Sequence, residues 1–148
     1  MSEHTMKAMK GQAVIALDTA EEIGEVKHFV VSADGRRIER LHIDGRGKKA
    51  LFTEWGDLES FGADRVMVKA ADATAGSHDD RDLDVASGDI ELIGSRVLDT
   101  AGFEHGRVVD AMFDSTSGAI VSIVTESDVT VDSGRIRSLG SYALVVDA

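Results

Sequence analysis

The chain has 148 residues, no cysteine and a formal net charge of −11. The lack of cysteine excludes a disulfide framework, a zinc–thiolate centre and a thiol nucleophile, and the negative charge argues against a surface that binds polyanions throughout. No apolar run approaches the ~18–20 residues needed to span a membrane, and residues 1–10 lack the apolar core of a secretion signal. We therefore expect a cytoplasmic protein.

The sequence repeats itself. Residues 17–20 recur as residues 98–101, and the glycine-to-valine spacing of residues 11–14 recurs at 94–97. An internal repeat indicates a duplicated structural unit. Each copy holds roughly 60 residues, a size that is marginally stable alone, so we expect the copies to pack on each other or on a second chain.

The first copy is predicted at residues 10–70, after a flexible tail at 1–9. Its hairpin signal is Asp34-Gly35, because glycine accepts the positive φ that a tight turn requires. The expected elements are strands at 26–31 and 38–43, a turn at 33–36, a strand at 49–53, a compact turn at 55–62 and a closing strand at 66–68.

Residues 71–87 are predicted to form an acidic linker, because small and acidic residues bury too little apolar surface to become ordered. The second copy is predicted at 88–148, with the same order of elements as the first. These are strands at 108–113 and 120–125, a turn at 114–118, a strand at 129–131, a turn at 135–140 and a strand at 144–146. Many short strands at regular spacing are typical of a small all-β barrel or sandwich.

Glycines and β-branched residues occupy matching positions in the two copies. In the second copy these are Gly94, Val97, Gly106, Val108, Gly118, Ile120 and the segment 136–146; in the first they are Gly11, Val14, Gly24, Val26, Gly35, Ile38, Gly62, Val66 and Val68. This pattern, over roughly residues 8–70 and 88–146, resembles the PRC-barrel domain family. That family includes the cytoplasmic domain of the photosynthetic reaction-centre H subunit and the C-terminal domain of a ribosome-maturation factor.

The resemblance implies an all-β fold of two tandem small, strongly bent β-barrels, each with a short helical turn. It also implies a role in assembly or protein contact, without a common active site. For the interior, we expect Trp55 and Phe61 to anchor the first copy, and Phe113 and Tyr142 to anchor the second.

Basic residues cluster after the first hairpin turn, and these are Arg36, Arg37, Arg40, Arg46, Lys48 and Lys49. Such a patch can contact an acidic protein or RNA phosphates, or it can dock against the acidic linker or the second copy of the same chain. No aromatic residue lies among them, so base stacking lacks support. We predict that Arg36, Arg37 and Arg40 face a protein partner, and we favour a protein over nucleic acid.

Two histidines, His28 and His42, are expected to face each other across the first hairpin. They are weak candidates for a metal site, but structural zinc needs four ligands, so we interpret them as strand surface. Alternating carboxylates at residues 79–84 lack the glycine and the later bidentate glutamate of a calcium loop. We therefore predict no metal and no cofactor.

These features predict a non-catalytic protein-interaction or assembly adaptor. No serine lies in a nucleophile-elbow motif, so no pattern supports an enzyme. Exposed sheet edges would also allow a homodimer. Two alternatives stay open: an RNA-processing or ribosome-maturation-linked factor, which the resemblance implies, and a metal- or ligand-binding sensor built on His28 and His42.

Overall fold

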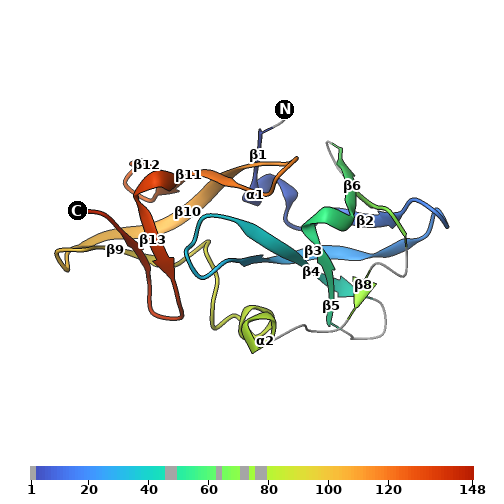
Figure 1. The fold of residues 1–148 in the computed structure, drawn as a ribbon, viewed down its shortest axis with the longest axis horizontal. Helices are drawn as coiled ribbons and strands as arrows, with labels where there is room; N and C mark the ends of the chain where they lie inside the picture. Colours follow the sequence, from blue (N-terminus) through green and yellow to red (C-terminus); the bar gives the residue numbers. More distant parts are fainter. Residues whose placement is uncertain (1–2, 46–49, 63–64, 71–73, 76–79) are drawn as a thin grey trace.

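The computed structural model describes residues 3–45, 50–62, 65–70, 74–75 and 80–148. It shows an elongated molecule whose two sequence halves lie toward opposite ends of the long axis (Figure 1). The fold is all-β, as predicted, with two sheets and only short helices. Among the described residues, no helix is long and apolar enough to cross a membrane.

The first unit is a seven-stranded sheet with the order β6-β7-β2-β3-β4-β5-β8. Its strands pair antiparallel except for β2 and β7, which run parallel. The elements are β2 (Ala13–Ala16), β3 (Glu22–Val31), β4 (Ile38–Gly45), β5 (Ala50–Glu54), the 3-10 helix η1 (Trp55–Asp57), β6 (Leu58–Phe61), β7 (Arg65–Val68) and β8 (Thr74–Ala75).

The second unit is a sheet with the order β12-β11-β10-β9-β14-β13, and the N-terminal strand β1 (Glu3–Thr5) also pairs with β10. Here β14 and β9 are the parallel pair. The elements are β9 (Arg96–Asp99), β10 (Glu104–Asp114), β11 (Ile120–Thr125), β12 (Thr130–Asp132), the 3-10 helix η3 (Ser133–Arg135), β13 (Ile136–Leu139) and β14 (Leu144–Val146).

The repeat in the sequence is therefore a repeat in the fold. Each unit has a central antiparallel hairpin, β3–β4 or β10–β11, and places its one parallel pair at the equivalent position. Register shifts bend the long strands of both hairpins. Among the described strands, the two ends of each order do not pair with each other, so each unit is a bent open sheet and not the closed barrel that we expected.

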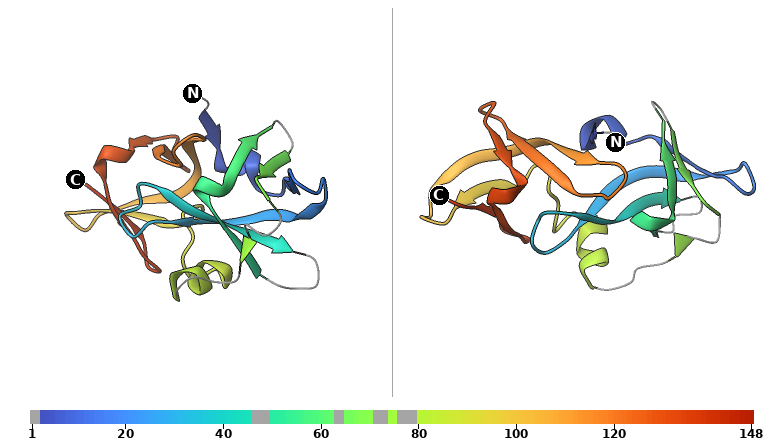
Figure 2. Two further views of the ribbon diagram at one scale, coloured as in Figure 1. Left: turned by 45° about the vertical axis from the view of Figure 1, so that its right-hand side comes forward. Right: turned by 45° about the horizontal axis from the view of Figure 1, so that its top comes forward.

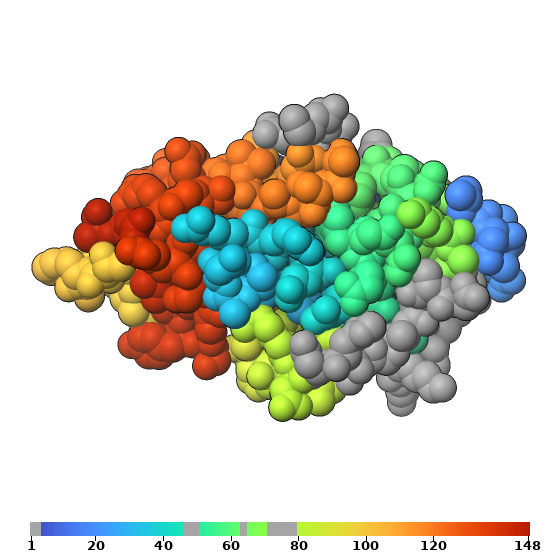
Figure 3. All heavy atoms as spheres, viewed as in Figure 1, coloured from blue at the N-terminus to red at the C-terminus, as the bar shows by residue number. Residues whose placement is uncertain are grey.

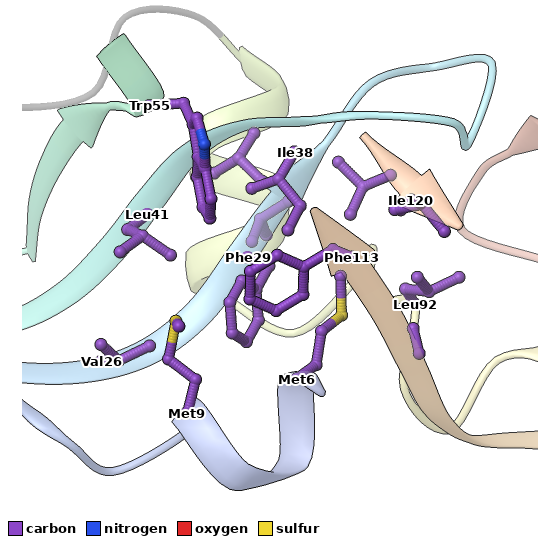
Figure 4. Packing of buried hydrophobic residues seen from close by; sticks show 14 of the residues in the cluster. Met6, Met9, Val26, Phe29, Ile38, Leu41, Trp55, Leu92, Phe113 and Ile120 are labelled. Atoms are coloured by element: carbon purple, nitrogen blue, oxygen red, sulfur yellow. The ribbon is translucent and has the colours of Figure 1, made fainter. Parts of the chain in front are cut away.

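The predicted flexible tail at residues 1–9 is wrong for the part that the structure describes. After β1, the single-turn helix α1 (Met6–Met9) is capped by Thr5, whose Oγ1 accepts a hydrogen bond from the Ala8 amide at 3.4 Å. Met6 and Met9 lie three residues apart, on one side of the turn, and each is only 1% exposed. Their side chains reach the core between the two units, so the segment is ordered by apolar burial (Figure 4).

The described part of the segment 71–87 also departs from the expected solvated linker. It contains the helix α2 (Asp80–Ala86), which packs against β3 and β4. Val85 is 1% exposed and Asp82 is fully buried, and the chain then buries Ile90 and Leu92. Composition over the whole segment missed these few buried side chains, which suffice to hold the helix on the first unit.

The two units share one hydrophobic core. Phe113 of the second unit is fully buried and meets Trp55 of the first edge-to-face, with ring centroids 5.5 Å apart. Phe29 and Met6 lie beside Phe113 in the same cluster (Figure 4). The expected roles of Trp55 and Phe113 as core anchors are confirmed, but Tyr142 is 68% exposed and is not a core residue.

The hairpin turns of the two units contact each other reciprocally, and we call this contact the clasp (Figure 2). The Ile38 amide donates to the Gly118 carbonyl, and the Ile120 amide donates to the Arg36 carbonyl, each at 2.8 Å. Ile38 and Ile120 begin equivalent strands, so the contact has approximate two-fold symmetry. A short antiparallel bridge between Arg37 and Ala119 lies at its centre.

Two turn glycines permit this approach. Gly35 has φ +73°, and a Cβ there would lie 2.7 Å from Ile136 Cγ2 of the second unit. Gly118 has φ +78°, and a Cβ there would lie 2.8 Å from the Ile38 carbonyl oxygen and 3.1 Å from the Trp55 ring. Only glycine fits at both positions without strain, so the clasp depends on one turn glycine from each repeat.

Candidate functional site

The structure separates the predicted basic cluster into residues with different roles. Arg40 is only 9% exposed, and its Nε lies 2.8 Å from Oδ1 of the fully buried Asp82. Glu54 lies 3.5 Å away on β5. The prediction that Arg40 faces a partner is wrong, because a buried guanidinium needs a carboxylate nearby and α2 supplies one. Arg40 instead docks against the acidic segment of its own chain, which was the alternative prediction.

Arg36 contacts the second unit. Its Nε donates to the Ile136 carbonyl at 2.8 Å, and its Nη2 donates to the Gly134 carbonyl at 3.3 Å. Arg81 of α2 donates to the Leu139 carbonyl at 3.0 Å, and the Leu139 amide donates to Ala33. These bonds cap backbone groups of η3 and of the end strand β13, so Arg36 serves the contact between the units.

Arg37 is exposed, as Arg36 is. Its backbone takes part in the bridge to Ala119 at the centre of the clasp. Arg46, Lys48 and Lys49 lie outside the described residues. The basic cluster is therefore not one continuous contact face in the described part of the chain.

His28 and His42 face each other across β3 and β4, as predicted. Their rings stack with centroids 5.3 Å apart and an interplanar angle of 11°. Nδ1 of His28 lies 3.1 Å from a Glu91 carboxylate oxygen. Burial, together with the nearby charges of His28 and Lys27, lowers the pKa of His42 to about 4.

This stacked geometry does not form a metal centre. Parallel rings hold their nitrogens in separate planes, whereas a shared metal needs lone pairs that converge on one point. No group of three or more histidines or carboxylates in the described part of the chain is placed to hold a metal ion. His42 instead packs on Phe52, with ring centroids 5.0 Å apart, as part of the first sheet.

The outer face of the second sheet carries an aromatic surface that the sequence analysis missed. Tyr142 lies in the turn between β13 and β14, and the Arg96 guanidinium sits 4.5 Å from its ring centroid. Nη1 of Arg96 also donates to the Tyr142 hydroxyl at 3.0 Å. The position of Tyr142 directly after Gly140-Ser141 was the available signal, because such a turn is commonly exposed.

An apolar hollow adjoins Tyr142, with a volume of about 340 Å³. Leu98 of β9 and Val145 of β14 point outward into it, because they alternate with the buried Val97 and Val146. We call this surface the Tyr142 face; it consists of Arg96, Leu98, Ser138, Gly140, Ser141, Tyr142, Ala143 and Val145.

The hairpin tips at the two ends of the molecule are also exposed. Phe103, in the β9–β10 turn, is 68% exposed, and Leu17, in the equivalent β2–β3 turn, is 54% exposed. Figure 3 shows both tips projecting from the body. Behind Phe103, Nε2 of His105 lies 2.7 Å from Oδ2 of Asp99, and this bond lowers the pKa of Asp99.

Comparison with known proteins identifies one family. A sequence profile of the PRC-barrel domain matches residues 1–74, which include strands β2 to β7 of the first unit. No curated protein matches the chain.

Proposed function

Because the chain belongs to the PRC-barrel domain family, we propose that it is a non-catalytic interaction module that docks a protein partner on the Tyr142 face. The second unit repeats the strand order of the first, which supports treating it as a further copy of the same domain. A cytoplasmic location and self-association remain predictions from the sequence.

The observation that carries the proposal is the exposed Tyr142 paired with the half-buried Arg96 beside an apolar hollow. Tyrosine and arginine are the residue types most enriched among those that dominate binding energy at protein interfaces. The cation–π contact and the hydrogen bond hold both side chains in one arrangement before a partner arrives. Less side-chain entropy is then lost on binding.

The rigid body behind this face also supports the proposal. The shared core and the reciprocal turns fix the second unit on the first. The inner face of β9 and β14 is buried through Val97, Leu144 and Val146. A partner would therefore meet a supported sheet surface, as expected for an assembly module.

The basic residues support an RNA partner less well. Arg40 is ion-paired with Asp82, and Arg36 is bonded to carbonyls of the second unit. Phosphate binding requires accessible cations. Arg37 remains the described residue of the cluster that can test the predicted basic face without disturbing either contact.

The test is photo-crosslinking from the Tyr142 face inside cells. A photoreactive amino acid replaces the exposed Ser141, and irradiation should join the chain to one discrete protein. Tyr142→Ser should abolish that product, because removing a central interface tyrosine commonly costs about 2 kcal/mol or more of binding energy. Leu83→Ser, which alters another exposed apolar residue on α2, is the matched control and should leave the product unchanged.

A product that survives Tyr142→Ser but disappears in Arg37→Glu would show that the partner binds the basic face and not the Tyr142 face. A product destroyed by ribonuclease would show that the partner is RNA and not a protein. A product of twice the chain mass would identify a second copy as the partner.

A further inference from the structure

The second unit has a cavity of about 460 Å³ at the end of its sheet, and this cavity is partly open to solvent. Its inner wall consists of the buried side chains of Val97, Thr125, Val131 and Val146. Its mouth is formed by Glu104 and His105 of β10, Val129 of the β11–β12 turn and Arg135 of η3. The cavity lies on the inner side of β9 and β14, opposite the Tyr142 face.

The mouth differs from the equivalent part of the first unit. Thr125 pairs with Val108 where Ile43 pairs with Val26, so Thr125 corresponds to Ile43. Thr125 donates its backbone amide to the Val129 carbonyl, and Ile43 pairs with Leu51. Val129 is therefore the equivalent of Leu51.

A third difference is at His105, which precedes Gly106 as Ile23 precedes Gly24. In the first unit Ile43 is fully buried, and Ile23 and Leu51 pack against the core. In the second unit the His105 side chain is 51% exposed, and Val129 is 53% exposed. Smaller or polar residues therefore stand at the positions that larger apolar side chains occupy in the first unit.

The charge at the end of the 3-10 helix is also reversed. Arg135 ends η3, whereas Asp57 ends the equivalent η1. Nη2 of Arg135 donates to the Asp147 carbonyl at 2.8 Å, which orients the guanidinium without neutralising it. Among the described residues, no carboxylate lies within ion-pair distance of Arg135. Glu104, the acid that also lines the cavity, has its carboxylate 3.9 Å from Arg96.

We propose that this cavity binds a small organic monocarboxylate, with its apolar body against the valine wall and its carboxylate on Arg135. Apolar walls with a few polar groups, in a volume of this size, are typical of small-molecule sites. A guanidinium binds a carboxylate through two parallel hydrogen bonds, which gives specificity for that group. The site is independent of the Tyr142 face and of any protein partner.

The test uses octanoate as the probe, with octanol as its uncharged counterpart. Isothermal titration calorimetry on the full chain should give a dissociation constant for octanoate of about 1 mM or lower, which a ligand of about ten heavy atoms can supply. Backbone amide shifts in NMR spectra should concentrate at Gly106, Thr125, Val129 and Val131.

Variants then separate the two parts of the site. Arg135→Gln should weaken octanoate binding about tenfold or more, because it removes a charge-assisted contact, and should leave octanol binding unchanged. Arg137→Gln is the matched control, because Arg137 is exposed, pairs with Asp147 and does not line the cavity. The double variant Thr125→Ile, Val129→Leu installs the first unit's residues and should abolish binding of both probes while the chain stays folded.

Wild-type protein that shows neither heat nor amide shifts with octanoate would overturn the proposal. Equal binding of octanoate to wild type and to Arg135→Gln would overturn the carboxylate assignment. Amide shifts confined to Leu98, Tyr142 and Val145 would move the ligand to the opposite face of the sheet and contradict the cavity.

Discussion

The two units have the same strand order but differ at their open ends. In the first unit β8 pairs with β5, and Ile23, Ile43 and Leu51 pack against the core. In the second unit no described strand pairs with the outer side of β12, and a cavity remains beside it. A duplicated fold can therefore keep one copy as a packed support, while the other copy offers a surface and a cavity for binding.

The contact between the units shows the same division. Trp55 of η1 anchors the shared core and donates from Nε1 to the Ser115 carbonyl at 3.0 Å, whereas the equivalent position in η3 is Ser133. Arg40 is tied to Asp82, and its equivalent in the second unit is Ser122. The first unit thus holds most of the specialised structural contacts, which leaves the second free to vary at its outer end.

The largest expected effect is at the ion pair that only the first unit has. Asp82→Asn should destabilise the chain by about 3–5 kcal/mol, because it leaves the buried Arg40 without its main counter-charge. Asp80→Asn, on the same turn of α2 but exposed, is the control and should change the free energy of unfolding by about 0.5 kcal/mol or less. Urea denaturation measures both, and equal effects would show that α2 is not held by this pair.

The next effect tests the clasp between the units. Gly35→Ala should cost about 2–3 kcal/mol, because the positive φ is unfavourable for alanine and the new methyl group meets Ile136. Gly88→Ala isolates the backbone term, since Gly88 has φ +86° and nothing within 4 Å of its added Cβ. That control should cost about 1–2 kcal/mol. If the two variants melt alike, Gly35 does not mark a close approach.

A pH effect should come from His42, whose equivalent in the second unit is Val124. Burial lowers the pKa of His42 to about 4, so between pH 6.5 and about 4 the unfolded chain binds more protons than the folded one. The contribution of neutral His42 to the free energy of unfolding is fully present above pH 6.5, and it is lost as the pH falls.

The change His42→Val should therefore flatten the stability profile by about 3 kcal/mol over that interval. Denaturation at several pH values compares the variant with wild type, and parallel profiles would contradict the shifted pKa.

The smallest effect exchanges residues between the two open ends. Thr125→Ile should stabilise the chain by about 1 kcal/mol, because the added carbon fills apolar space in the cavity. The reverse change, Ile43→Thr, should cost about 2 kcal/mol, because it removes a fully buried apolar group. Thermal melting should therefore show shifts of opposite sign, whereas equal losses would mean that the second cavity is not space that Ile can fill.

The sequence predicted the parts of the fold that depend on local pattern. The repeat, the hairpin at Asp34-Gly35 and the facing pair of His28 and His42 all follow from spacing and turn chemistry. It could not predict contacts between distant segments. The pairing of β1 with β10 joins residues about a hundred positions apart, and nothing in the local pattern of Glu3–Thr5 indicates that partner.

The candidate sites were predicted less well, for the same reason. Arg36 and Arg40 have the composition of a contact patch, but their roles depend on where Ile136 and Asp82 lie in space. The cavity lies where Thr125 replaces the equivalent Ile43, and that equivalence follows from the strand registers and not from the sequence alone. A residue difference between the repeats can be interpreted only when the equivalent positions are known.

Reciprocal turns and a shared core should make the two repeats one folding body. Differential scanning calorimetry of the whole chain can show whether they unfold together. We expect a single transition whose calorimetric enthalpy equals its van't Hoff enthalpy. Two resolved transitions, with the Trp55 fluorescence following only one of them, would contradict it.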